Sequence, residues 1–193
     1  MKILLTGTTG YIGKRLLPVL LREGHHVVSL VRSEKRVPAS LLRHPGHTVI
    51  EADLLQPGSL EKIPRDIEIA YFLVHSMSAS TGDFQTLEEK VARNFAGAME
   101  KTSARQVIYL SGISNADQLS KHLASRKAVE EILGASRVPL TTLRAGIIVG
   151  AGSASFEIIR DLVEKLPLMI TPKWLNTLCQ PIAIRTVIGY LAA

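Results

Sequence analysis

Residues 6–13 read Thr6-Gly7-Thr8-Thr9-Gly10-Tyr11-Ile12-Gly13, and this stretch decides the fold of the chain. It follows a short apolar run, Ile3-Leu4-Leu5, which is typical of a buried strand. The apolar residues that come next recur at helical spacing. They are Ile12, Leu16, Val19 and Leu20. The three glycines therefore lie in a turn that joins a strand to a helix.

Each glycine of this turn has a physical role beside a diphosphate group. Gly7 adopts backbone angles that other residues avoid, and Gly10 lets the backbone approach the phosphates. Gly13 lets the helix pack close to the strand, while the helix N-terminus offers unpaired N–H groups to negative charge. We therefore predict a dinucleotide site here, with an ordinary tight turn as the alternative. The residues expected around the cofactor are Gly7, Thr8, Thr9, Gly10, Tyr11, Ile12 and Gly13.

Strand and helix patterns alternate along the rest of the chain. Strands are expected at 26–31, 48–53, 67–77 (running into a loop), 106–110 and 141–150 (with its exit loop), and helices at 83–102, 117–133 and 153–166. This alternation predicts an α/β fold, a doubly wound parallel sheet with helices on both faces. Residues 1–193 are expected to form one dinucleotide-binding Rossmann domain, in which 151–193 is a partial substrate-side region. Because the last apolar pattern stops at Ala193 without a cap, we expect a fragment of a longer chain.

The composition excludes several classes of protein. A hydrophobic content of 46% and a charged content of 21% are ordinary for a soluble globular protein. The one cysteine, Cys179, cannot form an internal disulfide, so a cytoplasmic location is expected. No apolar run approaches the roughly 18 residues of a membrane span. The net charge of +6 comes without aromatic interleaving or zinc-finger spacing, so neither nucleic acid nor a metal is expected as a ligand.

The end of the second predicted strand indicates which dinucleotide is bound. An acidic residue there would hydrogen-bond the ribose hydroxyls of NAD, but this chain has Arg32, followed by Ser33, Lys35 and Arg36. A guanidinium group can pair with the 2′-phosphate of NADP and stack on adenine. We therefore predict NADP(H) as the cofactor. NAD(H) stays open because of Glu34, and Arg32 as a plain surface charge is the other alternative.

The spacing Gly-x-x-Gly-x-x-Gly resembles that of the short-chain dehydrogenase/reductase superfamily. Four further segments are similar to an atypical, NmrA-like branch from bacteria that carries a C-terminal domain of unknown function. They are Leu73–Met77, Ser120–Arg126, Val149–Phe156 and Gln180–Ala183.

The resemblance implies further cofactor contacts at two strand ends. Asp53, with Leu54, would meet the adenine amino group, whereas the alternative for Asp53 is a cap of the following turn. The fourth strand would open beside the cofactor at Leu73, Val74 and His75. His75 would touch the nicotinamide ribose or a substrate, and a structural histidine is the alternative.

The resemblance also implies a Tyr-x-x-x-Lys pair on the helix after the fifth strand, and this chain has none. The expected helix offers His122 and Arg126 at the same spacing, which places both side chains on one face. His122 titrates near neutrality and Arg126 can hold ribose hydroxyls. A solvated helix face is the alternative. The catalytic serine would be Ser111 or Ser114, and Ser114 could instead cap the helix.

Three functions are compatible with these residues. The first is an NADP(H)-dependent oxidoreductase that acts on an unidentified small molecule. The second is a non-catalytic NAD(P)-binding sensor or regulator of the NmrA type, and the third is a structural subunit stabilised by the cofactor. A homo-oligomer is compatible with each of them.

Overall fold

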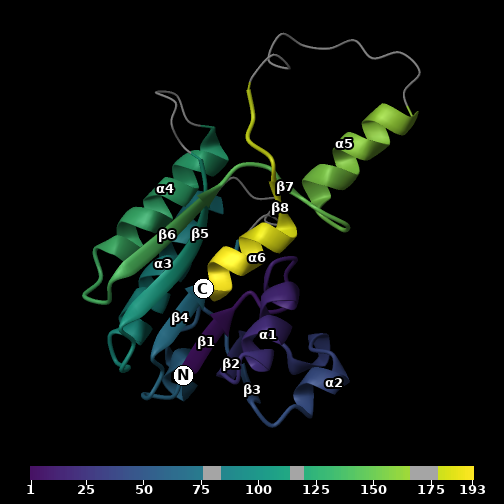
Figure 1. Ribbon diagram of the computed structural model, residues 1–193. Coiled ribbons are helices and arrows are strands. Elements are labelled where there is room, and N and C mark those ends of the chain that lie inside the picture. The colour runs from purple at the N-terminus through teal and green to yellow at the C-terminus, as the bar shows by residue number, and fades with distance from the viewer. Residues whose placement is uncertain (76–83, 114–119, 166–177) are drawn as a thin grey trace.

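The computed structural model describes residues 1–75, 84–113, 120–165 and 178–193. At its centre lies a six-stranded sheet in the order β3-β2-β1-β4-β5-β6, in which every neighbouring pair is parallel (Figure 1). The strands are β1 (Lys2–Thr6), β2 (His26–Val31), β3 (His47–Glu51), β4 (Ile69–Phe72), β5 (Gln106–Gly112) and β6 (Leu140–Ala145). The predicted doubly wound α/β fold is confirmed.

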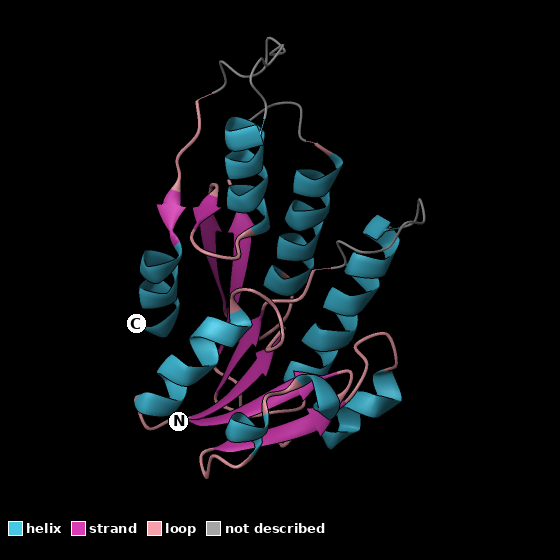
Figure 2. Ribbon diagram, turned by 90° about the vertical axis from the view of Figure 1, so that its right-hand side faces the viewer, coloured by secondary structure: helices cyan, strands magenta, loops and turns pink. Residues whose placement is uncertain are grey.

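Helices cover both faces of this sheet, as Figure 2 shows. One face carries α1 (Gly13–Arg22) and α6 (Ile184–Ala192), and the other carries α3 (Phe84–Met99) and α4 (Lys121–Gly134). Side chains along β1 alternate between the two cores, because successive residues of a strand point to opposite faces. Ile3 and Leu5 pack in the core that includes α1 and α6, whereas Leu4 packs in the core that includes α3 and α4.

Several element boundaries differ from the sequence prediction, and a side-chain hydroxyl accounts for two of them. The fourth strand, expected over 67–77, ends at Phe72 because the Leu73 amide donates to the Thr6 hydroxyl (3.1 Å) rather than to a strand backbone. The fourth helix, expected from 117, has Ser120 as its N-cap, and the Ser120 hydroxyl accepts from the Leu123 amide (3.4 Å). Short elements connect the strands of the other half of the sheet. η1 (Glu34–Arg36) and α2 (Ala39–Leu42) lie between β2 and β3, and η2 (Pro57–Lys62) lies between β3 and β4.

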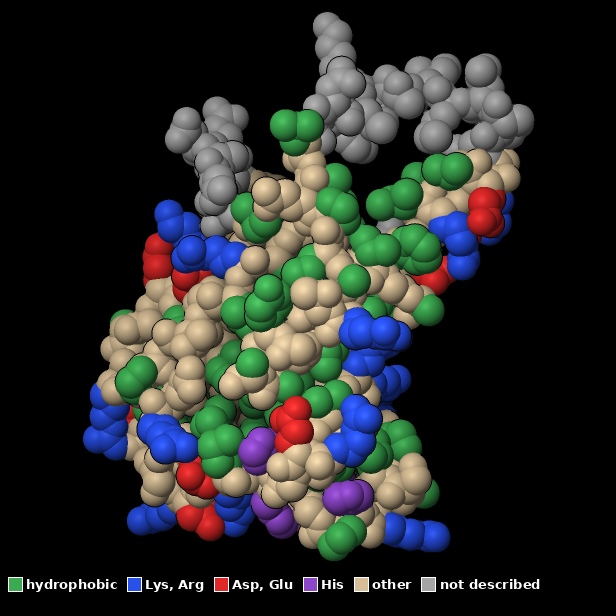
Figure 3. All heavy atoms as spheres, in the orientation of Figure 1, with side chains coloured by type: hydrophobic (Ala, Val, Ile, Leu, Met, Phe, Trp, Pro, Cys, Tyr) green, Lys and Arg blue, Asp and Glu red, His purple; other side chains and the backbone are tan. Residues whose placement is uncertain are grey.

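The segment after β6 forms a second, smaller layer. β7 (Ile148–Val149) pairs in parallel with β8 (Ile182–Ala183), and α5 (Ala154–Lys165) follows β7. This helix stands away from the main sheet in Figure 1, and hydrophobic side chains gather on it in Figure 3. Its exposed hydrophobic residues are Ile158, Ile159, Leu162 and Val163. Within the described ranges, none of the helices combines the length and apolar character needed to cross a membrane.

The strand order reverses between β1 and β4. From β1 the chain moves outward to β2 and β3, and from β4 it moves the opposite way to β5 and β6. In open parallel sheets, ligands bind outside the carboxyl ends of the strands at such a reversal. The glycine turn after β1 and residues 73–75 after β4 lie at this place.

Candidate functional site

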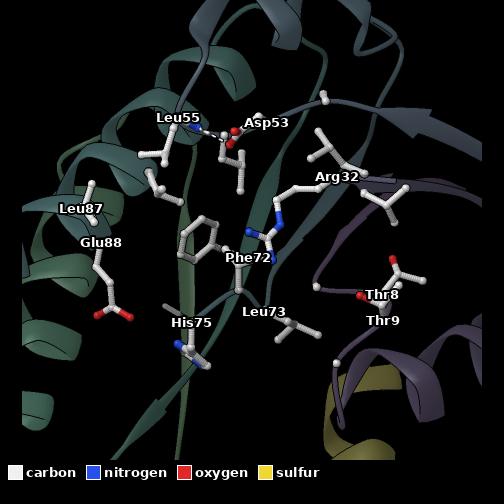
Figure 4. A pocket seen from close by; sticks show the side chains of 18 of the residues that line it. Thr8, Thr9, Arg32, Asp53, Leu55, Phe72, Leu73, His75, Leu87 and Glu88 are labelled. Carbon is white, nitrogen blue, oxygen red and sulfur yellow. Dashed lines mark hydrogen bonds between the residues drawn. The ribbon is translucent and has the colours of Figure 1, made fainter. Parts of the chain in front are cut away.

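A cavity of about 450 Å³ opens at the carboxyl ends of the strands (Figure 4). This volume lies in the range of small-molecule and cofactor pockets, about 300–1,000 Å³. The structure brings together in its wall most of the residues expected around the cofactor. These are Gly7, Thr8, Thr9, Gly10, Arg32, Asp53, Leu54, Leu73, Val74 and His75.

Two positions of the glycine turn, Gly7 and Gly13, have no room for a side chain. Gly7 has a φ of +69°, and a Cβ there would lie 2.4 Å from the Leu73 carbonyl oxygen. A Cβ on Gly13 would lie 2.2 Å from the Gly7 carbonyl oxygen. The N-terminus of α1 has no side-chain cap and no acidic residue in its first turn, so its positive end stays available to an anion.

Two buried threonine hydroxyls fasten this turn to the sheet. Thr6 Oγ1 donates to the Tyr71 carbonyl (2.9 Å), and Thr8 Oγ1 donates to the Leu5 carbonyl (3.0 Å). Thr6 also accepts from the Leu73 amide, so it joins the ends of β1 and β4. Sequence reasoning missed the role of Thr6, because a threonine before a glycine turn carries no distinctive pattern.

The basic rim of the cavity follows β2. Arg32 points into the cavity in Figure 4, and Ser33 and Arg36 also line it. Arg36 belongs to η1, and the carboxylate of Glu51 accepts from the Glu34 amide at the start of this short helix (2.5 Å). Glu34 itself is exposed and lies outside the cavity wall.

Asp53 caps the turn after β3, which is one of the two roles that the sequence left open, and it also lines the cavity. Its carboxylate accepts from the Leu55 amide (2.9 Å), which caps the turn after β3. Asp53, Leu54 and Leu55 also line the cavity, together with Leu87 and Val91 of α3. The turn therefore presents one carboxylate and several apolar side chains to a ligand.

The inner end of the cavity holds His75 and Tyr109, whose ring centroids lie 6.4 Å apart. Part of the His75 side chain is exposed, but protein atoms surround the ring closely enough to desolvate it. This desolvation, together with the positive charge of Arg126, lowers the pKa of His75 to about 4. Burial raises the pKa of Tyr109 to about 12. At neutral pH both side chains are uncharged hydrogen-bonding groups. Tyr109 was missed because it lies inside a predicted strand, where the sequence gives no sign that its side chain reaches the cavity.

Glu88 is a second residue that sequence reasoning missed. It lies on α3, is 7% exposed and lines the cavity. The Ser125 hydroxyl of α4 donates to its carboxylate (2.5 Å). This buried contact joins α3 to α4 immediately before Arg126. The only signal in the sequence was an acidic residue on the apolar face of a predicted helix.

The catalytic candidates lie beside this cavity, outside its described wall. His122 is exposed, and its ring meets Phe84 edge-on with the centroids 5.2 Å apart. Arg126 is half-buried, and its Cδ lies 3.8 Å from the position of a Cβ on Gly112. Ser111 is buried within hydrogen-bonding reach of Tyr109. Ser114 lies outside the described residues. Among the described side chains, no group of three or more His, Cys, Asp or Glu could hold a metal ion.

The last three residues of the turn, Tyr11, Ile12 and Gly13, are not part of the described cavity wall. Tyr11 points the other way, toward Gly150, where a Cβ would lie 2.9 Å from its hydroxyl oxygen. That hydroxyl is buried and has no hydrogen-bond partner in the part of the chain that the structure describes. Any contact of these three residues with the cofactor would come from their backbone N–H groups.

Replacing Tyr11 with phenylalanine is expected to stabilise the protein by about 1 kcal/mol, because a buried hydroxyl without a partner is costly. The free energy of unfolding in urea measures the effect. Tyr71→Phe is the matched control, since the Tyr71 hydroxyl donates to the Leu191 carbonyl (2.5 Å) and its removal should destabilise. A loss of stability in Tyr11→Phe would contradict the assignment of an unsatisfied hydroxyl.

The sequence is similar to that of a known family and of several characterised proteins. A model of the NAD(P)H-binding family matches residues 7–165. The chain is 25% identical over 168 residues to a ceramide reductase of Caulobacter vibrioides, a match that covers 86% of this chain and 52% of that protein. It is 24% identical over 155 residues to the photosystem II assembly factor Ycf39 of Synechocystis sp., covering 78% of this chain and 46% of that protein. The chain thus spans about half the length of these curated relatives.

A solved structure agrees with the fold. The UDP-glucuronic acid 4-epimerase of Bacillus cereus, in complex with UDP-4-deoxy-4-fluoro-glucuronic acid and NAD, superposes with a TM-score of 0.75 at 23% identity. The match covers 99% of this chain and 72% of that chain, and it shows the fold alone. The family match extends over most of the chain, and its first residue is Gly7 of the glycine turn. The chain therefore belongs to the NAD(P)H-binding family, in the atypical, NmrA-like branch of the short-chain dehydrogenases/reductases that its motifs resemble, and its cofactor is a nicotinamide dinucleotide.

Proposed function

We propose that this chain binds NADP(H) and is part of an oxidoreductase that acts on an unidentified small molecule. The observation that carries this proposal is the composition of the cavity wall. One cavity joins the glycine turn, which suits a diphosphate, to Arg32 and Arg36, which suit a further phosphate. A dinucleotide with a 2′-phosphate matches both ends of this arrangement.

Each part of the wall then has a partner on the cofactor. The turn from Gly7 to Gly13 would hold the diphosphate through backbone N–H groups. Asp53 and Leu54 would meet the adenine, and Leu73 and Val74 would border the path toward the nicotinamide. His75, uncharged at neutral pH, would hydrogen-bond the nicotinamide ribose.

The preference for NADP(H) over NAD(H) rests on the charges at the rim. Arg32 and Arg36 are the cations among the described residues of the cavity wall, and Arg32 points inward. Glu34 was the residue that kept NAD(H) open. Its amide is held by Glu51, and its side chain lies outside the described cavity wall, so it would not repel the 2′-phosphate directly.

The bound nicotinamide supplies the hydride in this proposal, and residues of β5 and α4 would handle the proton. His122 is exposed at the start of α4 and would exchange a proton with the substrate oxygen. Arg126, one turn later, would hold the ribose hydroxyls. Ser111, or Ser114 beyond the described residues, would orient the substrate oxygen. Residues 151–193 follow the carboxyl end of β6 and would provide part of the substrate side.

NADPH oxidation, measured against a panel of carbonyl compounds, tests this function. Once a substrate is found, His122→Ala should lower kcat by about 100-fold or more, because it removes a general acid. His44→Ala is the matched control, since His44 is an exposed histidine outside the cavity wall and its loss should leave kcat unchanged. Unchanged turnover in His122→Ala would remove His122 from the mechanism.

A second function, a nucleotide-binding sensor or regulator, is favoured by two observations. The chain lacks a Tyr-x-x-x-Lys pair, and one of its relatives is described as an assembly factor. Tight NADPH binding without turnover across the whole panel would favour this function. The cytoplasmic location and the homo-oligomer expected from the sequence stay predictions under either function.

A further inference from the structure

Arg15 connects the glycine turn to the segment that follows β7. Its Nη1 donates to the Tyr11 carbonyl (3.0 Å), and its Nη2 donates to the Ala151 carbonyl (2.7 Å). Its guanidinium carbon lies 4.0 Å from the centroid of the Tyr11 ring, in a cation–π contact. We name this arrangement of Tyr11, Arg15 and Ala151 the Arg15 clasp.

The backbone on the far side of the clasp is packed tightly against Tyr11. A Cβ on Gly150 would lie 2.9 Å from the Tyr11 hydroxyl oxygen and 2.4 Å from Cγ2 of Ile184. Gly152 has a φ of +76°, which favours glycine, and its Cβ position lies 3.9 Å from both Arg15 and Tyr11. Residues 150–152 therefore fit closely over the Tyr11 side chain, and a small shift of Tyr11 would displace their backbone.

The segment held by the clasp continues into α5. The Gly152 amide donates to the Glu157 carboxylate in the first turn of that helix (3.0 Å). The Ser153 hydroxyl donates to the Ile148 carbonyl in β7 (2.7 Å). Because of these two hydrogen bonds, fixing the position of Ala151 also restrains β7 and the start of α5.

We propose that Arg15 is a positioning residue through which nucleotide binding at the glycine turn fixes residues 150–153 and the start of α5. The proposal rests on the proposed function in one respect, namely that this turn holds the cofactor diphosphate. Tyr11 belongs to that turn, while its carbonyl and ring are held by Arg15. A ligand that binds the turn more tightly in its clasped arrangement must favour that arrangement, and the coupling is reciprocal.

Hydrogen–deuterium exchange with and without NADPH tests the proposal. In the wild type, NADPH should slow exchange in the peptide 147–157 as well as in the turn at residues 6–16. In Arg15→Gln, NADPH should still slow exchange in the turn but should no longer change it in 147–157. NADPH affinity should fall by about fivefold or more, as reciprocal coupling requires. Lys14→Gln removes the same charge from the adjacent exposed position and should behave as the wild type.

Three controls separate coupling from simple loss of structure. Exchange within α3, measured without NADPH because this helix lines the cavity, should be the same in all variants, which shows that the fold is intact. Arg15→Lys keeps the charge but loses the planar fork, so it should show only part of the NADPH-dependent slowing in 147–157. A residue with a purely structural role would speed exchange in 147–157 equally with and without NADPH, and that result would overturn the proposal.

The two proposals fail in different ways. If the wild type binds NADPH and the slowing in 147–157 is absent or survives Arg15→Gln, the role of Arg15 is wrong and the proposed function stands. If the wild type shows no NADPH-dependent change even in the turn, the proposed function fails, and the role of Arg15 fails with it.

Discussion

Gly13→Ala is expected to lower the free energy of unfolding by about 2–3 kcal/mol and to remove detectable NADPH binding. The new methyl group would lie 2.2 Å from the Gly7 carbonyl oxygen and 2.7 Å from the Cα of Thr8. Both neighbours are backbone atoms, so no side chain can move aside and the turn itself must shift. Forcing extra volume into such a packed place typically costs about 1–3 kcal/mol. Urea denaturation and NADPH titration measure the two effects.

Gly97→Ala is the matched control for this experiment. Gly97 also lies in a helix, α3, but a Cβ there would have open space around it. The same substitution should therefore stabilise the protein by about 0.5–1 kcal/mol, since alanine is the better helix former. If Gly13→Ala had as little effect on binding as Gly97→Ala, close approach of α1 to the turn could not be a requirement of the nucleotide site.

Arg32→Glu is expected to weaken NADPH binding by about 100-fold and to change NADH binding by much less. The substitution removes a charge-assisted contact to the 2′-phosphate and replaces it with a like charge. Each hydrogen bond to a charged group contributes about 1.5–3 kcal/mol, and about 1.4 kcal/mol corresponds to a tenfold change in affinity. Titration of the wild type and the variant with both nucleotides measures the change in preference.

Arg43→Glu makes the same charge change at an exposed arginine outside the cavity wall. It controls for the general effect of net charge on binding an anionic nucleotide, and it should weaken NADPH and NADH binding slightly and to the same extent. Equal NADPH affinities in the wild type and Arg32→Glu would sink the NADP(H) assignment, while leaving the family membership untouched.

Local patterns were sufficient to predict the architecture. The apolar runs at 3–5 and 26–31 and the glycine turn are patterns of only a few residues. They correspond to β1, β2 and the turn between β1 and α1. The alternation of strands and helices then leaves few topologies, because parallel crossovers are right-handed. Prediction was weaker at boundaries such as Leu73, where the hydroxyl of Thr6, far away in sequence but on the neighbouring strand, replaces a backbone acceptor.

The cavity wall was predictable where its residues follow strand ends, as Arg32, Asp53 and His75 do. Glu88 and Tyr109 could not be found in this way, because each lies inside a helix or strand and reaches the cavity only through the packing of α3, α4 and β5. The contact between Arg15 and Ala151 joins residues 136 positions apart. No spacing rule connects such a pair before the fold is known.

The packing of α6 over α1 has a consequence for how the chain folds during synthesis. α1 is among the first elements to leave the ribosome, yet its apolar face is completed by Val187, Ile188 and Leu191, and Tyr71 is bonded to a carbonyl 120 residues further on. Contacts of such long sequence separation form late, because the entropy of closing a long loop must be overcome first. The growing chain therefore carries an apolar face of its sheet that α1 covers only in part until α6 emerges. In that interval it is most exposed to aggregation and has most need of chaperones.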